Sequence, residues 1–266
     1  MEFFLVLIAV LSNILALEAQ VLGSLAEPKS PYCQPKLCSK AVKHVACEKS
    51  TAGFSSSCSI ETLKLVNMTE HVDKIIKLHN ERRNRLANGK ETTLPRAARM
   101  ATMQWSNELA DLAEFNAKMC KAQHDECHNT QTFPNSGQNI IVFNMTHNVE
   151  NTIMEQLVPE LLSLGAKTWW SEFENMTSDS LEVYSCDSKE QKIYRHFAVM
   201  AVEGNSHVGC AASQYLVQNL TQFQLTCNYA RAPVCGQKVY SFRPVGCKTG
   251  RNRKHSALCS PDEQFL

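Results

Sequence analysis

The chain lacks a strong charge of either sign. Its 266 residues include 27 Lys and Arg and 26 Asp and Glu, which gives a formal net charge of +1. A protein that binds nucleic acid normally carries a basic field, so this balance argues against a nucleic-acid partner. One basic cluster, Lys248 to His255 (KTGRNRKH), is interpreted as a solvated loop rather than as a patch for an anionic partner.

Long hydrophobic runs are also missing after the first residues. Phe3 to Leu17 are apolar, but this run is short for a membrane span and lies at the extreme N-terminus. We predict a secretory signal peptide over residues 1–24. An uncleaved anchor is the alternative, because the segment before the apolar run carries Glu2 and no Lys or Arg. No second apolar run is long enough to span a membrane, so no span is expected after signal cleavage.

The sequence lacks the short motifs of common hydrolases. It contains no H-E-x-x-H, no G-x-S-x-G and no convincing nucleophile. The polar residues that could perform chemistry are His124, Gln138, Glu172 and His196. A His/Glu/His set suits a catalytic zinc shell, and a His with a carboxylate suits acid/base work, but nothing in the local sequence places these residues together.

Cysteine, in contrast, is abundant. The chain has 12 Cys, an even number far above cytosolic usage. Four N-glycosylation sequons begin at Asn67, Asn144, Asn175 and Asn219. Together with the N-terminal leader, these features predict a secreted, extracellular glycoprotein.

The stretch Cys120 to Cys127, CKAQHDEC, allows three interpretations: a zinc knuckle, half of a catalytic site, or a turn held by disulfides. Structural zinc sites use closely spaced pairs such as C-x2-C, whereas six residues separate these cysteines. Because the expected compartment is oxidising, disulfides are favoured for both. Another cysteine-rich segment, residues 31–62, has little hydrophobic periodicity, so we expect disulfides to hold it against the main domain.

Hydrophobic periodicity predicts helices before strands. One helix is predicted over Thr69 to Asn88, with Thr69 as N-cap, Gly89 as C-cap and residues 81–85 as its exposed face. Its buried stripe is predicted to consist of Val72, Ile75, Ile76, His79 and Arg83. A second is predicted to start at Leu94 and to run into Cys120. A third, interrupted by Pro159 and Gly165, ends near Phe173.

Two strands are predicted over residues 208–217 and 222–229. The second alternates polar and apolar residues, as a half-buried strand does. A hairpin would join them, with the Asn219 sequon at its exposed tip. Helices together with an antiparallel sheet give an α+β class.

Several short motifs then appear in a fixed order. They are Leu78–Arg83 (LHNERR), Met103–Ala110 (MQWSNELA), Cys120–Ile141, Trp169–Glu172 (WWSE), His196-Phe197 with Val208–Cys210, and Cys227–Ala230 (CNYA). Together they resemble the CAP superfamily of cysteine-rich secretory, antigen 5 and plant pathogenesis-related proteins. The resemblance covers roughly residues 31–260. Within the superfamily, the sequence is most similar to the arthropod antigen 5 branch.

The resemblance implies a three-layer α-β-α sandwich with a disulfide-rich N-terminal extension. The implied organisation is an extension over residues 31–62, a CAP domain over 68–232 and a disulfide-linked C-terminal extension over 233–266. The implied disulfides are Cys33–Cys47, Cys38–Cys127, Cys58–Cys120 and Cys210–Cys227, with Cys247–Cys259 and Cys186–Cys235 for the remaining cysteines.

The resemblance also implies a central cleft with two His and two acidic residues, where divalent metal binds through the histidines. The matching positions are His124, Gln138, Glu172 and His196. Gln138 departs from the acidic pattern, and an amide cannot act as a general base. Ala198, Val199 and Val202 replace polar family residues after His196, so a more apolar cleft wall is expected. No cofactor is required on this view, and only weak Zn²⁺ binding through His124 and His196 is expected.

The functional expectation is a secreted, non-enzymatic, venom allergen 5-like binding protein of an extracellular fluid, salivary or reproductive by analogy. Its partner would be an extracellular protein or glycan. A lipid or sterol carrier is the first alternative, because the apolar stretch from Ile153 to Leu162 could line a channel. A metal-dependent hydrolase is disfavoured.

Overall fold

A computed structural model describes residues 30–39, 42–47, 63–91, 93–145 and 149–265. The predicted signal peptide and Cys58 lie outside the described residues. Within the described part of the chain, no helix is both long enough and apolar enough to cross a membrane.

The fold is built on a mixed β-sheet. Its centre is the hairpin of β4 (His207–Val217) and β5 (Leu220–Tyr229). Strand β3 (Gly137–Asn144) pairs antiparallel with β5, β1 (Lys64–Leu65) pairs antiparallel with β4, and the short β2 (Gln104–Trp105) runs parallel to β4. The hairpin was predicted, but β3 was not.

The hairpin turn is tighter than the sequence suggests. Only Gln218 and Asn219 connect the two strands, with φ angles of 49° and 66°. Two successive residues with positive φ match the twist of the flanking strands, and Asn tolerates that conformation. The sequon residue Asn219 is therefore at the tip of the hairpin, as predicted, and it is exposed.

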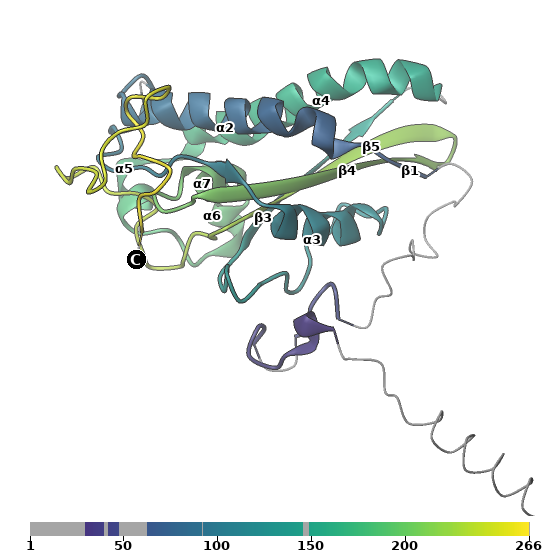
Figure 1. Cartoon of the computed structure of the whole chain (residues 1–266), viewed down its shortest axis with the longest axis horizontal. Coiled ribbons are helices and arrows are strands. Elements are labelled where there is room, and N and C mark those ends of the chain that lie inside the picture. Colours follow the sequence, from purple (N-terminus) through teal and green to yellow (C-terminus); the bar gives the residue numbers. More distant parts are fainter. Residues whose placement is uncertain (1–29, 40–41, 48–62, 92, 146–148, 266) are drawn as a thin grey trace, which may run out of the picture.

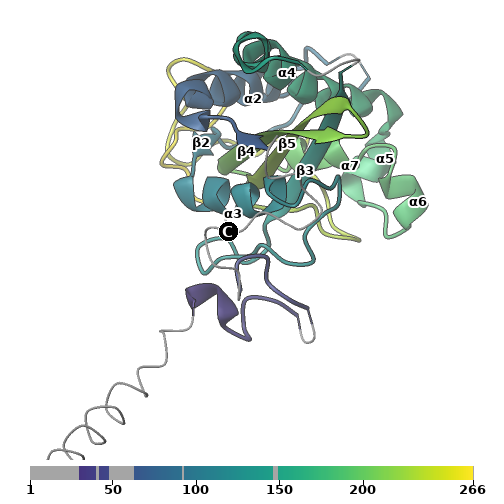
Figure 2. The same ribbon diagram turned by 90° about the vertical axis from the view of Figure 1, so that its right-hand side faces the viewer.

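Helices cover both faces of the sheet, as Figures 1 and 2 show. Helices α2 (Val72–Ala87) and α4 (Asn151–Ser171) lie on one face and α3 (Asn107–Ala117) on the other. Shorter elements are η1 (Pro31–Cys33), η2 (Met68–His71), η3 (Glu172–Asn175), α5 (Ser178–Glu182), α6 (Ser188–Gln191) and α7 (Arg195–Ala201). The arrangement is the expected α+β, three-layer α-β-α sandwich.

The prediction that β5 is half-buried is wrong. Its polar residues Gln224, Thr226 and Asn228 are fully buried beneath α3. Burial is tolerated because Asn116 of α3 accepts hydrogen bonds from Gln224 Nε2 and Thr226 Oγ1, at 3.1 and 2.8 Å. The alternating pattern of β5 suggests a face open to solvent, but its polar residues form a buried polar layer between β5 and α3.

The predicted helix boundaries also need correction. Helix α2 starts at Val72, because Met68–His71 form a 3₁₀ turn and Thr69 is not its cap. Its end is as predicted, since Gly89 has a φ of 67° and its N–H bonds to the carbonyl of Leu86. The second helix begins at Asn107, far beyond Leu94, where the Ser106 side chain accepts from the N–H of Leu109.

Helix α4 is continuous, although Pro159 and Gly165 were expected to interrupt it. A proline removes the hydrogen bond to the residue four positions earlier, here Glu155, which is exposed and open to water. Gly165 is required by a close approach, because a Cβ there would lie 3.1 Å from Leu225 Cδ2 of the sheet. Both residues fit the helix for reasons that the local sequence does not show.

The motif of α2 consists of buried polar anchors. His79 Nδ1 donates to the Ile75 carbonyl at 2.8 Å, and its Nε2 accepts from the Tyr229 hydroxyl at 3.0 Å. Burial lowers the pKa of His79 to about 4, which keeps the ring neutral in this pair. Asn80 bonds to both the N–H and the carbonyl of Met103. These contacts fix α2 to the end of β5 and to the segment before β2.

Arg83 is the third anchor, as its place in the predicted buried stripe indicates, whereas the prediction that residues 81–85 form an exposed face is wrong for this residue. Its side chain is completely buried, and its guanidinium makes five hydrogen bonds to four backbone carbonyls. The acceptors are Ala101, Met200, Val202 and Glu203. Burial lowers its pKa to about 9, so it remains charged at neutral pH. Arg83 therefore ties α2 to the end of α7.

The glycine of the VGC motif, Gly209, is required by a close contact with α3. A Cβ at this position would meet the Ala110 nitrogen at 2.1 Å and the Ser106 oxygen at 2.4 Å. The first turn of α3 therefore lies directly on the backbone of β4. No other residue type fits without moving the helix.

Both extensions are attached to this sandwich. The structure contains the disulfides Cys33–Cys47, Cys38–Cys127, Cys186–Cys235, Cys210–Cys227 and Cys247–Cys259, which are pairs that the resemblance implies. Residues 30–39 and 42–47 lie near α3 (Figure 2), where the Val45 N–H donates to the Cys127 carbonyl at 2.8 Å.

The C-terminal extension is held by the buried carboxylate of Glu263. This group accepts five hydrogen bonds, from Arg99, Lys248 and Thr249. Burial alone would raise the pKa of Glu263, but these hydrogen bonds lower it to about 2. The next residues are bound as well, since Arg231 donates to the Phe265 carbonyl and the Arg99 guanidinium lies over the Phe265 ring.

The Arg83 anchor yields a stability prediction. We expect Arg83→Met to lower the free energy of unfolding by about 3 kcal/mol or more, because it leaves several buried carbonyls without a donor. The matched control is Lys77→Met on the same helix, whose side chain is 62% exposed. We expect this control to cost less than about 1 kcal/mol. Urea unfolding of both variants measures the difference, and equal losses would contradict the anchoring role.

Candidate functional site

One half of the candidate site lies where α4 ends and α7 begins. Glu172 follows the last turn of α4, and His196 is in the first turn of α7. His196 Nδ1 and Glu172 Oε1 are 2.6 Å apart. The second carboxylate oxygen accepts from the backbone N–H groups of His196 and Phe197, at 2.8 and 3.3 Å. Glu172 therefore both orients the imidazole and satisfies the start of a helix.

The indole of Trp169 completes this half. Its ring is fully buried and stacks on the His196 imidazole, with centroids 6.3 Å apart and planes inclined by 25°. The WWSE and HF motifs thus meet in one packed unit. The side chains of Glu172 and His196 remain 20% and 16% exposed, so they are reachable from solvent.

The other half comes from the CKAQHDEC loop and β3. His124 Nδ1 lies 2.9 Å from Gln138 Oε1, and the backbone N–H of Asp125 donates to the same oxygen at 3.2 Å. Gln138 Nε2 donates to Asp125 Oδ2 at 2.7 Å and to Asn228 Oδ1 at 3.0 Å. The amide of Gln138 is therefore engaged at both ends.

The two halves belong to one site. Burial lowers the pKa of His124, the hydrogen bond to Gln138 opposes that shift, and the charges of Arg195 and His196 lower the pKa further. The two halves are joined at β3, because Asn139, next to Gln138 on that strand, donates from Nδ2 to the His196 carbonyl at 3.0 Å. The structure therefore brings together all four predicted residues.

The donor set suits a two-histidine metal site. Each imidazole uses Nδ1 for a hydrogen bond to an acceptor, which leaves Nε2 for a ligand. No group of three or more His, Cys, Asp or Glu that could hold a metal ion occurs among the described residues. Any divalent ion would thus take His124 and His196 from the protein and complete its coordination from solvent or a partner.

The three apolar replacements after His196 do not form an open cleft wall. Ala198, Val199 and Val202 are 0%, 7% and 9% exposed and belong to the main hydrophobic core. The loss of polar groups in this segment therefore adds to the core of the sandwich.

The cysteines of CKAQHDEC are both structural. Cys127 pairs with Cys38, and Cys120 is also disulfide-bonded. The implied partner of Cys120, Cys58, lies outside the described residues. Neither thiol is available for zinc, so the stretch is a disulfide-held loop that presents His124.

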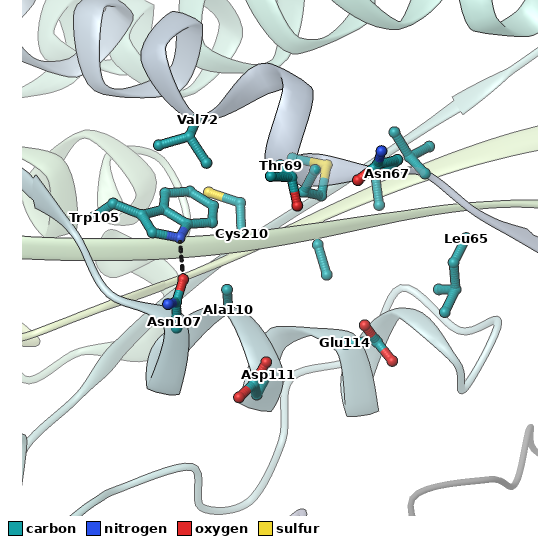
Figure 3. Close-up of a pocket in the computed structure, with 14 residues that line it drawn as sticks. Leu65, Asn67, Thr69, Val72, Trp105, Asn107, Ala110, Asp111, Glu114 and Cys210 are labelled. Atoms are coloured by element: carbon teal, nitrogen blue, oxygen red, sulfur yellow. Dashed lines mark hydrogen bonds between the residues drawn. The ribbon is translucent and has the colours of Figure 1, made fainter.

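The structure also shows a hollow that the sequence analysis missed. It has a volume of about 430 Å³ and lies between α3 and the segment from β1 to α2 (Figure 3). Its lining is mostly polar, with apolar surface from Ala110 and Ala211, and Trp105 stands at one end with its Nε1 bonded to Asn107 Oδ1 at 2.9 Å. The MQWSNELA motif supplies both Trp105 and Asn107, but the motif itself does not indicate a hollow.

The fold and the paired histidines define a disulfide-linked domain of the CAP type. The family described as "CAP: Cysteine-rich secretory protein family" matches residues 76–229, more than half of the chain. The chain belongs to this family.

Curated relatives place it among antigen 5-like proteins of arthropods. "Venom allergen-1" of Aedes aegypti is 32% identical over 88% of this chain and 88% of that protein. "Antigen 5 like allergen Cul n 1" of Culicoides nubeculosus is also 32% identical, over 68% of this chain and 81% of that protein. "Tabinhibitin 3" of Tabanus yao is 25% identical over 94% of both.

Solved structures support the same fold. BmVAL-1 aligns with a TM-score of 0.58 and 21% identity, over 71% of this chain and 93% of that one. The crystal structure of NaASP2 with Zn²⁺ aligns with a TM-score of 0.54 and 20% identity, over 76% of this chain and all of that one. At these identities the likeness concerns the fold.

The paired histidines yield a metal-binding prediction. We expect weak zinc binding in calorimetry that disappears in His124→Ala, because a single imidazole is a poor site. Glu172→Gln should weaken binding about tenfold or more, since it removes the carboxylate that orients His196. His255→Ala, in the C-terminal extension, is the matched control and should leave the heat unchanged. Heat that survives in His124→Ala would show that zinc binds elsewhere.

Proposed function

We propose that this protein is a secreted, non-enzymatic binding protein of an extracellular fluid. Its disulfides support an oxidising compartment, and its antigen 5-like relatives support a venom allergen-like protein. A salivary or reproductive fluid is proposed by analogy alone. Its partner is an extracellular protein or glycan.

One observation carries the non-enzymatic assignment. The position that would supply a second carboxylate holds Gln138, whose amide is fully used in hydrogen bonds to His124, Asp125 and Asn228. An amide neither takes up nor releases a proton near neutral pH. The other carboxylate, Glu172, is committed to His196 and to the start of α7. The cleft therefore orients two imidazoles without offering a free acid/base group beside them.

The hollow beside Trp105 is a candidate contact surface for a glycan partner. An aromatic ring and nearby apolar surface can pack on the carbon face of a sugar, while Asn107, Asp111 and Glu114 at the rim can bond to hydroxyl groups. Its volume is in the range of small-ligand sites.

Affinity capture tests the proposal. Folded protein is immobilised and exposed to the fluid that contains it, beside a reduced and alkylated sample as matched control. We expect a partner that only the folded protein retains and that soluble folded protein displaces. Trp105→Ala should lower retention if the hollow is the contact surface.

Hydrolysis is measured on the same preparation. We expect no turnover of peptide or ester substrates with added zinc. Turnover that Glu172→Gln abolishes would establish the hydrolase and overturn the non-enzymatic assignment.

A lipid carrier is the second candidate, because the apolar stretch of α4 has two different faces. Met154 and Val158 are buried at a second hollow of about 340 Å³, which Leu65 and Val66 also line. Ile153 lies on the opposite, exposed face. This hollow is smaller than a channel for a long acyl chain but would admit part of one.

Filling the hollow tests this candidate. We expect Val158→Trp to remove any lipid that mass spectrometry finds after extraction of the purified protein. Leu164→Trp is the matched control, because Leu164 is on the same helix and 46% exposed. Purified wild-type protein without lipid, together with no uptake of added fatty acid, would exclude the carrier.

A further inference from the structure

The orientation of the Gln138 amide determines what the cleft presents. An amide has an acceptor end and a donor end, and rotating it by half a turn exchanges them. With its oxygen toward His124, the ring must donate from Nδ1 and keeps Nε2 as a lone pair. With its nitrogen toward His124, the opposite tautomer would result. Neighbouring groups must therefore determine which orientation the Gln138 amide adopts.

Asp125 makes that choice, together with Asn228 Oδ1, which also accepts from Gln138 Nε2 at 3.0 Å. A carboxylate only accepts hydrogen bonds, so the Gln138 atom 2.7 Å from Asp125 Oδ2 must be the nitrogen. The backbone N–H of the same residue only donates, so the Gln138 atom 3.2 Å from it must be the oxygen. The two groups of Asp125 thus hold the amide at both ends and in one orientation.

Asp125 is itself fixed from the buried layer under α3. Its side chain is 1% exposed, and its Oδ1 accepts from Asn116 Nδ2 at 2.8 Å. Asn116 Nδ2 also donates to the Gln123 carbonyl at 2.9 Å, so it holds the loop on the other side of His124. Asn116 Oδ1 is bonded in turn by Gln224 and Thr226 of β5. His128 Nδ1 lies 3.8 Å from Asp125 Oδ2.

We propose that Asp125 is the positioning residue of the cleft, and that it holds, one hydrogen bond further from His124, the negative charge that an acidic residue at position 138 would carry. Gln138 transmits its effect to His124 Nδ1, as Glu172 acts directly on His196 Nδ1. Both rings then present Nε2. The proposal deepens the proposed function, because it concerns the same cleft and fixes which ring atom a ligand meets.

The arrangement also explains why an acid does not fit at position 138. A carboxylate there would place an oxygen about 2.7 Å from Asp125 Oδ2, where the amide now donates. Two like charges at that separation repel strongly in a buried site. Two ionised carboxylates are therefore strongly disfavoured in the pair, so an ionised acid fits at position 138 only when the acid at position 125 is removed.

Nitrogen-15 NMR of the histidine rings tests the proposal directly. At about pH 8, where free imidazole is neutral, we expect His124 in the Nδ1–H tautomer. Asp125→Ala removes one acceptor of Gln138 Nε2 but leaves Asn228 Oδ1 and the backbone N–H of residue 125 in place, so we expect the opposite tautomer to become detectable while the Nδ1–H form remains the major one. His196 is the internal control and should keep its tautomer, since Glu172 is untouched. An unchanged His124 signal in a folded Asp125→Ala protein would overturn the proposal.

A charge exchange covers the case in which Asp125→Ala does not fold. We expect Gln138→Glu to lower the thermal midpoint by about 5 °C and Asp125→Asn by a similar amount. The double variant Asp125→Asn/Gln138→Glu should recover more than half of the combined loss, because one charge again faces one amide. Losses that simply add would refute the pairing. These readings involve no partner, so failure to capture one would leave them intact.

Discussion

A single buried charge, on Arg83 of α2, connects that helix to the segment around Ala101 and to the end of α7. The Arg83 guanidinium lies in the core and bonds to carbonyls of two segments far apart in the sequence, near Ala101 and at the end of α7. A buried cation is costly unless each donor finds an acceptor, so its surroundings have little freedom to rearrange. Since α7 spans only seven residues, fixing its end also fixes His196 at its start. The cleft therefore depends on a contact that lies outside it.

The site follows the same logic at a smaller scale. Each histidine is oriented by an acceptor that is itself bonded elsewhere: Glu172 to the start of α7, and Gln138 to Asp125 and β5. Ordering these supporting side chains costs conformational entropy during folding. Less conformational entropy is therefore lost when a ligand binds. A cleft built in this way presents two ring nitrogens in a constant position.

Much of the architecture could be predicted from ordered motifs, but their physical roles could not. The motif LHNERR locates α2 correctly, and helical spacing puts Arg83 in the buried stripe. The charged run 81–85 nevertheless suggests an exposed face, since a charged side chain with buried carbonyl partners looks like any other in sequence. The alternation in β5 indicates a strand but not that α3 covers its polar face. Strand β3 was missed because its pattern lies inside a motif read for chemistry.

The candidate site shows the same limit. His124, Gln138, Glu172 and His196 were found because the motifs match the family position by position. Asp125 lies next to His124 in the sequence and was passed over, because its role arises only when β3 brings Gln138 against it. The Trp105 hollow depends on how α3 rests on Gly209, which no spacing rule shows.

The binding of Glu263 has a bearing on how the chain can be divided. The family match ends at residue 229, and a laboratory fragment cut there would appear to contain the entire domain. Such a fragment would leave Arg99 without its carboxylate and would remove Arg231 itself, whose guanidinium donates to the Phe265 carbonyl. The region that matches the family is therefore shorter than the region that packs as one folded unit. Residues near the C-terminus, such as Glu263 and Phe265, are part of that folded unit.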